Sequence, residues 1–363
     1  MTYIVHRDCR QFRGELPCKP HKLHGVICEG CPHYDPVDMR ILIVKLAAAG
    51  DVIRTTPLLR KLRASHPKCW ISWLTETPDV VPTRGFDANG VDEVLKWGVD
   101  STLIAQQTPW DWAIVLDKDR PASALSNSLQ AKRKAGYDLR NGRPAPVNDA
   151  AVHKFLTGID DNLNRANTLS YPQEIFQICG YEWQGEEYVL DPCLDQPLPE
   201  GLPHERPLVG LNTGCAPRWK SRLWPETYWI ELAAHLKQAG CGVLLLGGPL
   251  EHEKNLRIAD ESGAIYRGYF PLKQFIRMVG EIDLMVTAVT MAMHIAIGLK
   301  RRLVLFNNIF NRHEFELYGR GEILEPIPPC DQFFVAECKY HCMERIEPVR
   351  VFEAVKAQLA AMQ

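Results

Sequence analysis

Short, unbroken runs of apolar residues recur along this chain and alternate with helical patterns of apolar and polar positions. The runs occupy residues 41–44, 70–74 and 112–116 in the first half, and 208–211, 242–246, 284–286 and 303–306 in the second. Such runs are typical of strands that helices cover on both faces. The pattern also predicts a helix over 225–238, which Gly240 ends. This alternation predicts parallel sheets joined by right-handed crossovers.

Three regions of different composition divide the chain. Residues 1–38 are polar and rich in Cys, His and Pro, with too few apolar residues for a core of their own. Prolines between residues 192 and 207 mark a linker between two alternating series. We therefore predict an α/β protein in which two doubly wound, Rossmann-like domains, at 39–200 and 201–345, face a cleft. A cysteine-rich, metal-binding segment at 1–38 precedes them, and a C-terminal helix at 346–363 follows.

Composition and charge exclude several classes of protein. Of the 363 residues, 46% are hydrophobic and 24% charged, which is typical of a globular protein. A formal net charge of −2 gives no reason to expect general nucleic-acid binding. No apolar run approaches the length that spans a bilayer, and the first residues lack the apolar core of a signal peptide. The sequence thus predicts a cytoplasmic protein without a transmembrane segment.

A small-residue turn follows the first predicted strand and carries a carboxylate. Residues 47–49 are all Ala, and Gly50 and Asp51 come next, just before a helical pattern. Asp51 thus lies near the positive end of a helix, which favours its ionised form. A carboxylate at the carboxyl end of a parallel strand is a candidate general base, since ligands bind at that end of the sheet. The alternative is an acid that only caps the helix.

Two groups of cysteines suggest metal binding. Cys9, Cys18, Cys28 and Cys31 form the pattern C-x8-C-x9-C-x2-C, which suits a structural tetrahedral zinc or a single iron. A nearby His could replace one ligand, an iron–sulfur cluster would use the same four thiolates, and the remaining alternative is a flexible arm with reduced thiols. Near the other end, Cys330, Cys338 and Cys342, with His341, form either a second metal site or a set of plain neighbours.

Three strand-to-helix junctions of the second half could hold a phosphorylated ligand. Residues 211–219 follow a strand, carry the hydroxyl of Thr213, and lead into the cations Arg218, Lys220 and Arg222. Glu251 follows a Gly-Gly-Pro turn, where a carboxylate could accept a hydrogen bond from a ribose hydroxyl. The third junction is at 290–296. Each junction taken alone is also compatible with an ordinary α/β loop.

Taken in order, these junctions resemble the heptosyltransferases of glycosyltransferase family 9, which have the GT-B fold. The resemblance runs from residue 39 to about 363. It implies that Asp51, in the Gly-Asp-Val turn, deprotonates the acceptor hydroxyl. It also implies a donor site that includes Arg222, at the position of the Lys in the family's Lys-Arg-Trp-Pro segment, and Glu251, for the nucleoside. The full expected set of donor-binding residues is Thr213, Gly214, Arg218, Lys220, Arg222, Glu251, Thr290, Met291, Ala292 and His294.

One residue departs from the family pattern. The third junction of the family usually begins with an Asp that meets the donor sugar, whereas this chain has Val289 there, and Val cannot hydrogen-bond a sugar. The resemblance implies an inverting transferase that moves a sugar, with heptose from ADP-heptose as the expected donor, to a hydroxyl of a saccharide, lipopolysaccharide core or protein. No divalent metal is expected in the active site, and a homo-oligomer is compatible with the cysteine segment. The alternatives are a catalytically weak binding or assembly subunit, which Val289 favours, and a nucleotide-sugar epimerase.

Overall fold

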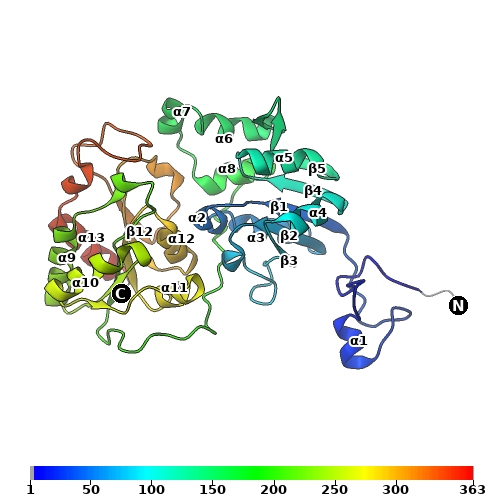
Figure 1. The fold of residues 1–363 in the computed structure, drawn as a ribbon, viewed down its shortest axis with the longest axis horizontal. Helices are drawn as coiled ribbons and strands as arrows, with labels where there is room; N and C mark the ends of the chain where they lie inside the picture. Colours follow the sequence, from blue (N-terminus) through cyan, green and yellow to red (C-terminus); the bar gives the residue numbers. More distant parts are fainter. Residues whose placement is uncertain (1–3, 363) are drawn as a thin grey trace.

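The computed structural model describes residues 4–362; residues 1–3 and 363, which belong to the predicted first and last segments, lie outside it. Two domains stand side by side, each built on a sheet with helices on both faces (Figure 1). The first sheet has the order β3-β2-β1-β4-β5-β6, in which only β6 is antiparallel to its neighbour. Its strands are β1 (Met39–Val44), β2 (Cys69–Thr75), β3 (Glu93–Lys96), β4 (Trp110–Val115), β5 (Ala131–Arg140) and β6 (Arg143–Pro146).

The second sheet repeats this order as β9-β8-β7-β10-β11-β12, with all neighbours parallel. Its strands are β7 (Leu208–Asn212), β8 (Gly242–Leu246), β9 (Ile265–Tyr266), β10 (Leu284–Ala288), β11 (Arg302–Phe306) and β12 (Gly321–Leu324). The strand order reverses next to β1 in one sheet and next to β7 in the other. In doubly wound sheets, ligands bind outside the carboxyl ends of the strands at such a point.

Helices connect the strands and cover both sheets. The first domain contains α2 (Ala49–Ile53), α3 (Pro57–Ser65), η1 (Pro78–Val80), α4 (Val99–Gln107), α5 (Arg120–Ser128), η2 (Asp149–Ala151), α6 (Val152–Thr157), α7 (Asp161–Ala166) and α8 (Tyr171–Ile178). The second contains η3 (Lys220–Arg222), α9 (Glu226–Gln238), η4 (Pro249–Glu251), α10 (His252–Ser262), α11 (Leu272–Val279), α12 (Met291–Gly298), η5 (Arg312–Glu314), η6 (Cys342–Arg345) and α13 (Pro348–Ala360). None of the helices described between residues 4 and 362 is both long enough and apolar enough to cross a membrane.

Burial on both faces explains the unbroken apolar runs. In β1, Ile41 and Ile43 pack into one core cluster, while Leu42 and Val44 pack into another on the opposite face. The cluster that holds Ile41 continues into the second domain, where it includes residues of α11 and α12. A separate cluster on the far face of the second sheet takes in α9, α10 and α13, so the C-terminal helix packs against that sheet. The two domains therefore share part of one core.

The predicted strands and the helix at 225–238 are confirmed, with ends shifted by one or two residues. The strands that apolar runs did not reveal are β3, β5, β6, β9 and β12, most of which lie toward the edges of the sheets. Such strands have polar, partly exposed positions, as in β5, and so lack a continuous apolar signal. The small-residue turn after β1 also differs from expectation because a helix, α2, already begins at Ala49 and is followed by α3 at Pro57.

The N-terminal segment lies at the far side of the first domain, where α1 (Lys19–His24) is its only helix among the described residues (Figure 1). Arg10 attaches this segment to the domain. Its guanidinium pairs with Asp35 of the segment at 3.0 Å and also with Asp92 of the domain, whose side chain is 3% exposed. The segment is thus held by a cation that contacts both parts.

Candidate active site between the two domains

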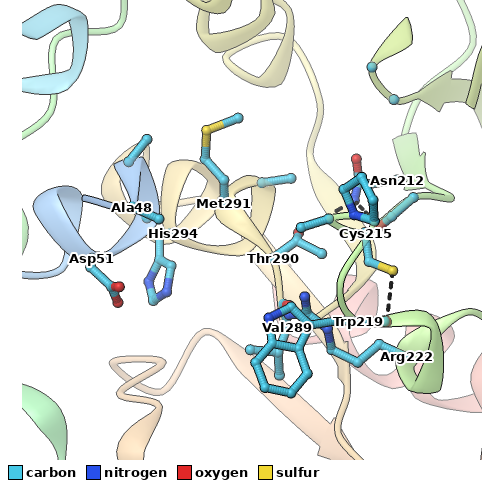
Figure 2. A pocket seen from close by; sticks show the side chains of 18 of the residues that line it. Ala48, Asp51, Asn212, Cys215, Trp219, Arg222, Val289, Thr290, Met291 and His294 are labelled. Carbon is cyan, nitrogen blue, oxygen red and sulfur yellow. Dashed lines mark hydrogen bonds between the residues drawn. The ribbon is translucent and has the colours of Figure 1, made fainter. Parts of the chain in front are cut away.

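A cavity of about 690 Å³ opens between the carboxyl ends of the two sheets. Residues that follow β1, β7 and β10 line it, so it occupies the position at which the strand order of each sheet reverses. Figure 2 shows Asp51 and His294 on one side of this cavity and Arg222 with Trp219 on the other. The first pair comes from α2 and α12, and the second from the loop around η3.

Asp51 presents a partly exposed carboxylate to the cavity from the first turn of α2. Its Oδ1 atom lies 2.8 Å from Nη2 of Arg54, and its side chain is 36% exposed. Burial opposes ionisation, but the charges of Arg54 and Lys45 lower the pKa of Asp51 to about 2. The group is therefore an ionised, accessible acceptor at neutral pH, as a general base must be.

Arg54 and Glu314 belong to this side of the cavity although the sequence analysis did not select them. Besides its ion pair with Asp51, Arg54 lies 3.6 Å from Oε2 of Glu314, and its guanidinium stands 3.7 Å from the ring centroid of Tyr171. The spacing of three residues between Asp51 and Arg54 on a helix was an available signal for this pair. No local signal identifies Glu314, which comes from η5 of the other domain.

His294 is buried where the two domains meet. Its Nδ1 atom lies 3.4 Å from the hydroxyl of Tyr188, and its ring stacks on that of Tyr188. Burial and the charge of Arg54 lower the pKa of His294 to about 3, so the imidazole is neutral at physiological pH. A Cβ atom on Gly50 would stand only 2.7 Å from Cδ2 of His294, so α2 approaches α12 too closely for a larger residue.

Arg222 provides a buried positive charge on the opposite side of the cavity. Its guanidinium donates a hydrogen bond to the carbonyl oxygen of Val289 and lies 5.4 Å from the ring centroid of Trp219. Burial lowers its pKa to about 10, which leaves it cationic at neutral pH. No carboxylate within residues 4–362 forms an ion pair with it. A buried cation without a counter-ion favours an anionic ligand.

Val289, which replaces the acid of the family pattern, contributes its backbone to the site. Its carbonyl oxygen positions Arg222, while its side chain adds an apolar surface to the lining. Thr290 comes next and is the residue before α12, whose first amide groups therefore face the cavity. The hydroxyl of Thr290 lies 3.2 Å from that of Thr287. This helix end adds a second attraction for an anion beside Arg222.

Glu251 lines the same half of the cavity next to the turn after β7. A Cβ atom on Gly214 would stand 2.2 Å from Cδ of Glu251, so a larger residue there would displace the Glu251 side chain. The Oε2 atom of Glu251 accepts a hydrogen bond of 2.9 Å from the amide of Gly248. This bond holds the carboxylate at the turn. Within residues 4–362 the other carboxylate oxygen accepts no hydrogen bond, so it is free for a ligand hydroxyl.

Of the expected site residues, Asp51, Gly214, Arg222, Glu251, Thr290, Met291, Ala292 and His294 all line the cavity. Three donor-binding candidates lie outside the lining. The hydroxyl of Thr213 is buried and donates to Oδ1 of Asn255 at 2.6 Å. Arg218 is exposed, with its guanidinium near the ring of Trp219. Lys220 is also exposed and pairs with Glu337 at 3.2 Å. Of the three cations in the basic cluster, Arg222 is the one that lines the cavity.

The two groups of cysteines differ in geometry. Cys9, Cys18, Cys28 and Cys31 line one small cavity of about 30 Å³ together with His6 and His33. Among the described residues, however, only Cys330, Cys338 and Cys342 bring three metal-ligating atoms within 4.8 Å of one another. The four-cysteine site therefore stays a prediction, because its thiols surround a common space without converging as ligands of one ion do.

The chain is similar to known proteins along most of its length. The model of glycosyltransferase family 9 (heptosyltransferase) matches residues 105–318. Lipopolysaccharide heptosyltransferase 1 of Pseudomonas aeruginosa is 23% identical over 364 residues, which cover 89% of this chain and 99% of that protein.

Solved structures show the same fold. The Escherichia coli heptosyltransferase WaaC with ADP-2-deoxy-2-fluoro heptose superposes with a TM-score of 0.63 at 16% identity, and covers 88% of this chain and 99% of its own. The iron-containing dodecameric glycosyltransferase TibC of enterotoxigenic E. coli H10407 gives a TM-score of 0.54 at 14% identity, with 90% and 77% covered. These likenesses confirm the GT-B architecture predicted from the sequence.

Proposed function

The chain belongs to glycosyltransferase family 9, and we propose that it transfers heptose from ADP-heptose to a hydroxyl of a lipopolysaccharide core saccharide, with inversion at the anomeric carbon. One observation carries the proposal. An ionised carboxylate, Asp51, and a buried cation without a counter-ion, Arg222, face one cavity from opposite domains (Figure 2). A heptosyltransferase relative of similar length and the WaaC structure, whose ligand is an ADP-sugar, support this donor and acceptor class.

The proposed reaction uses the two sides of the cavity for different charges. The acceptor hydroxyl attacks the anomeric carbon as Asp51 removes its proton, and the bond from that carbon to the diphosphate oxygen breaks. Negative charge then grows on the leaving ADP, where Arg222 and the amide groups at the start of α12 stabilise it. Attack from the face opposite the leaving group inverts the anomeric configuration. The products are the glycosylated acceptor, ADP and a proton.

The remaining cavity residues are assigned to donor recognition. We assign Glu251 to a ribose hydroxyl, because its carboxylate lies at the turn beside Gly214. Val289 leaves the hydrogen-bonding groups of the sugar without the family's usual acidic partner. The donor sugar must therefore be held through other polar groups of the cavity, such as Thr290, which precedes α12, and Asn212, whose Nδ2 lies 3.4 Å from the hydroxyl of Thr290.

An Asp51→Asn variant tests the assigned base. It keeps the shape of the side chain and removes the proton acceptor, so turnover of ADP-heptose should fall by roughly 10² to 10⁴ while ADP affinity stays nearly constant. Asp100→Asn is a matched control, because Asp100 occupies the first turn of α4, is exposed and lies outside the cavity. Equal turnover of the Asp51→Asn variant and the parent would refute the mechanism.

Val289 supports a second candidate, a binding or assembly subunit with little catalytic activity. Such a subunit would bind ADP through Arg222 but would release no heptose from ADP-heptose with any core saccharide. The same assay separates the two, since turnover in the parent protein supports only the transferase. The cytoplasmic location, the homo-oligomer and a protein acceptor stay predictions.

A further inference from the structure

Three thiols converge outside the cavity, in the segment between β12 and α13. The Sγ atoms of Cys330 and Cys338 lie 3.6 Å apart, and those of Cys338 and Cys342 lie 3.3 Å apart. All three are free thiols, and their sulfurs lie within 4.8 Å of one another. Thiolates bound to one tetrahedral zinc at about 2.3 Å lie about 3.8 Å from each other. The observed sulfur-to-sulfur distances are close to those between thiolates that bind one metal ion.

The surrounding structure holds this cluster in place. Cys342 is fully buried and Cys330 is 9% exposed, and both pack against Ile309. Nη1 of Arg345 donates to the carbonyl oxygen of Pro328 at 3.2 Å, which ties η6 to the chain just before Cys330. A disulfide would join two of the sulfurs and leave the third beside it, whereas an ion uses all three.

We propose that Cys330, Cys338 and Cys342 bind one Zn²⁺ ion as thiolates. Zinc prefers soft sulfur ligands in tetrahedral geometry, and three close thiolates need a cation to offset their mutual repulsion. No other His, Cys, Asp or Glu in residues 4–362 lies close enough to all three sulfurs to complete the set. The fourth position is therefore left to water or another small ligand. The ion is distinct from the one predicted for the N-terminal segment.

The segment that carries these thiols also forms a wall of the candidate active site. Phe334 packs edge-on against Trp219 and Phe310, with ring centroids 5.2 and 5.4 Å away, and all three rings line the cavity. Ser221, the neighbour of Arg222, donates its amide to the carbonyl oxygen of Ala336 at 2.9 Å. A zinc ion that fixes residues 330–342 would thus fix the wall beside Arg222. This consequence rests on the proposed function, whereas the metal site does not.

Metal stoichiometry tests the site in the full-length protein. The test uses a background of Cys28→Ser with Cys31→Ser, which removes two ligands of the predicted N-terminal site. After Zn²⁺ is added, native mass spectrometry should find one ion in this background and none once Cys338→Ser is introduced. With Co²⁺, the thiolate-to-metal absorption should disappear in the same variant. Cys241→Ser is the control, because Cys241 is buried in the core behind α9, apart from the cluster.

Two further results make this test decisive. Cys338 is partly exposed, so replacement by Ser should leave the circular dichroism spectrum unchanged, and a lost ion then reports a lost ligand. Equal zinc content with and without Cys338 would overturn the site.

Binding of ADP tests the link to the cavity wall. In the same background, removal of zinc by a chelator should weaken ADP binding about tenfold, which corresponds to about 1.4 kcal/mol. The chelator should have no further effect on the Cys338→Ser variant. Equal ADP affinity with and without zinc overturns the link to the wall. A protein that holds zinc through Cys338 but binds no ADP contradicts the proposed function and leaves the metal site standing.

Discussion

Arg222 is the residue on which donor binding should depend most. It is buried, cationic and without a carboxylate partner among the described residues, so a diphosphate would supply its missing counter-charge. Replacement by Ala should weaken ADP binding by roughly 1.5 to 3 kcal/mol, the range for a charge-assisted hydrogen bond. Calorimetry measures this change. Arg218→Ala is a matched control from the same loop, because Arg218 is exposed and outside the cavity. Unchanged affinity in the Arg222 variant would remove it from the donor site.

His294 should make the stability of the protein depend on pH. The unfolded chain protonates this residue below its ordinary pKa of 6.5, whereas burial and Arg54 keep the folded imidazole neutral to about pH 3. Protons therefore favour the unfolded chain. The contribution of the neutral, buried His294 to the free energy of unfolding is complete above pH 6.5 and is lost as the pH falls toward 3.

The pH effect can be measured by urea unfolding of the parent and a His294→Gln variant. Between pH 6.5 and about pH 5 the parent should lose about 1.5 kcal/mol more unfolding free energy than the variant. His313→Gln, at an exposed position in the same domain, should follow the parent. Parallel curves for the parent and His294→Gln would contradict a neutral, buried His294.

At the scale of elements, the contact between α2 and α12 sets the geometry of the site. Each helix follows the central strand of a different sheet, and Gly50 lets them approach closely. Gly50→Ala should lower kcat/KM by about tenfold or more, because its Cβ would move α12 away and so separate Asp51 from Thr290. Ala is a better helix former than Gly, so helix propensity alone predicts a more stable α2 in this variant and no loss of turnover.

Steady-state kinetics of two glycine variants test the helix contact. Gly85→Ala is the control, because its Cβ would meet only Oγ1 of Thr83 at an ordinary distance of 3.6 Å. If Gly50→Ala has the kcat/KM of the Gly85→Ala variant, the close approach of α2 and α12 has no role in turnover.

At the scale of the whole molecule, Glu314 links the two domains by ion pairs. It comes from the second domain and lies 3.6 Å from Arg54 and 3.4 Å from Lys154, both of the first. Burial opposes its ionisation, but Lys154 and Arg54 hold the pKa of Glu314 below its usual value. Glu314→Gln removes the negative charge that pairs with Lys154 and Arg54, so it should lower the free energy of unfolding by about 1.5 to 3 kcal/mol.

Urea unfolding and solution scattering check this link between the domains. The Glu314→Gln variant should also show a larger radius of gyration if the ion pairs hold the domains together. Glu322→Gln, at an exposed position of β12, should resemble the parent in both measurements. A Glu314 variant with the parent's stability and radius would show that the shared core alone joins the domains.

The sequence by itself determined the two-domain α/β architecture and the central carboxylate. Strands buried on both faces must be apolar throughout, so β1, β4, β7 and β10 are visible as runs. Asp51 was found for the same reason, because it follows the first such run at the end of the sheet where ligands bind. Edge strands such as β9 and β12 carry no equivalent constraint and were not visible.

Only the tertiary structure decided which polar groups meet. Sequence spacing placed Arg218, Lys220 and Arg222 in one cluster, but the fold buries Arg222 in the cavity and leaves the other two in solvent. Glu314 reaches Arg54 across 260 residues of chain, and Cys330 meets Cys342 because η6 turns back toward it. Local patterns follow from burial of each segment against its own sheet. Charges and thiols from distant segments come together only through packing of the two domains and their loops, which no local pattern records.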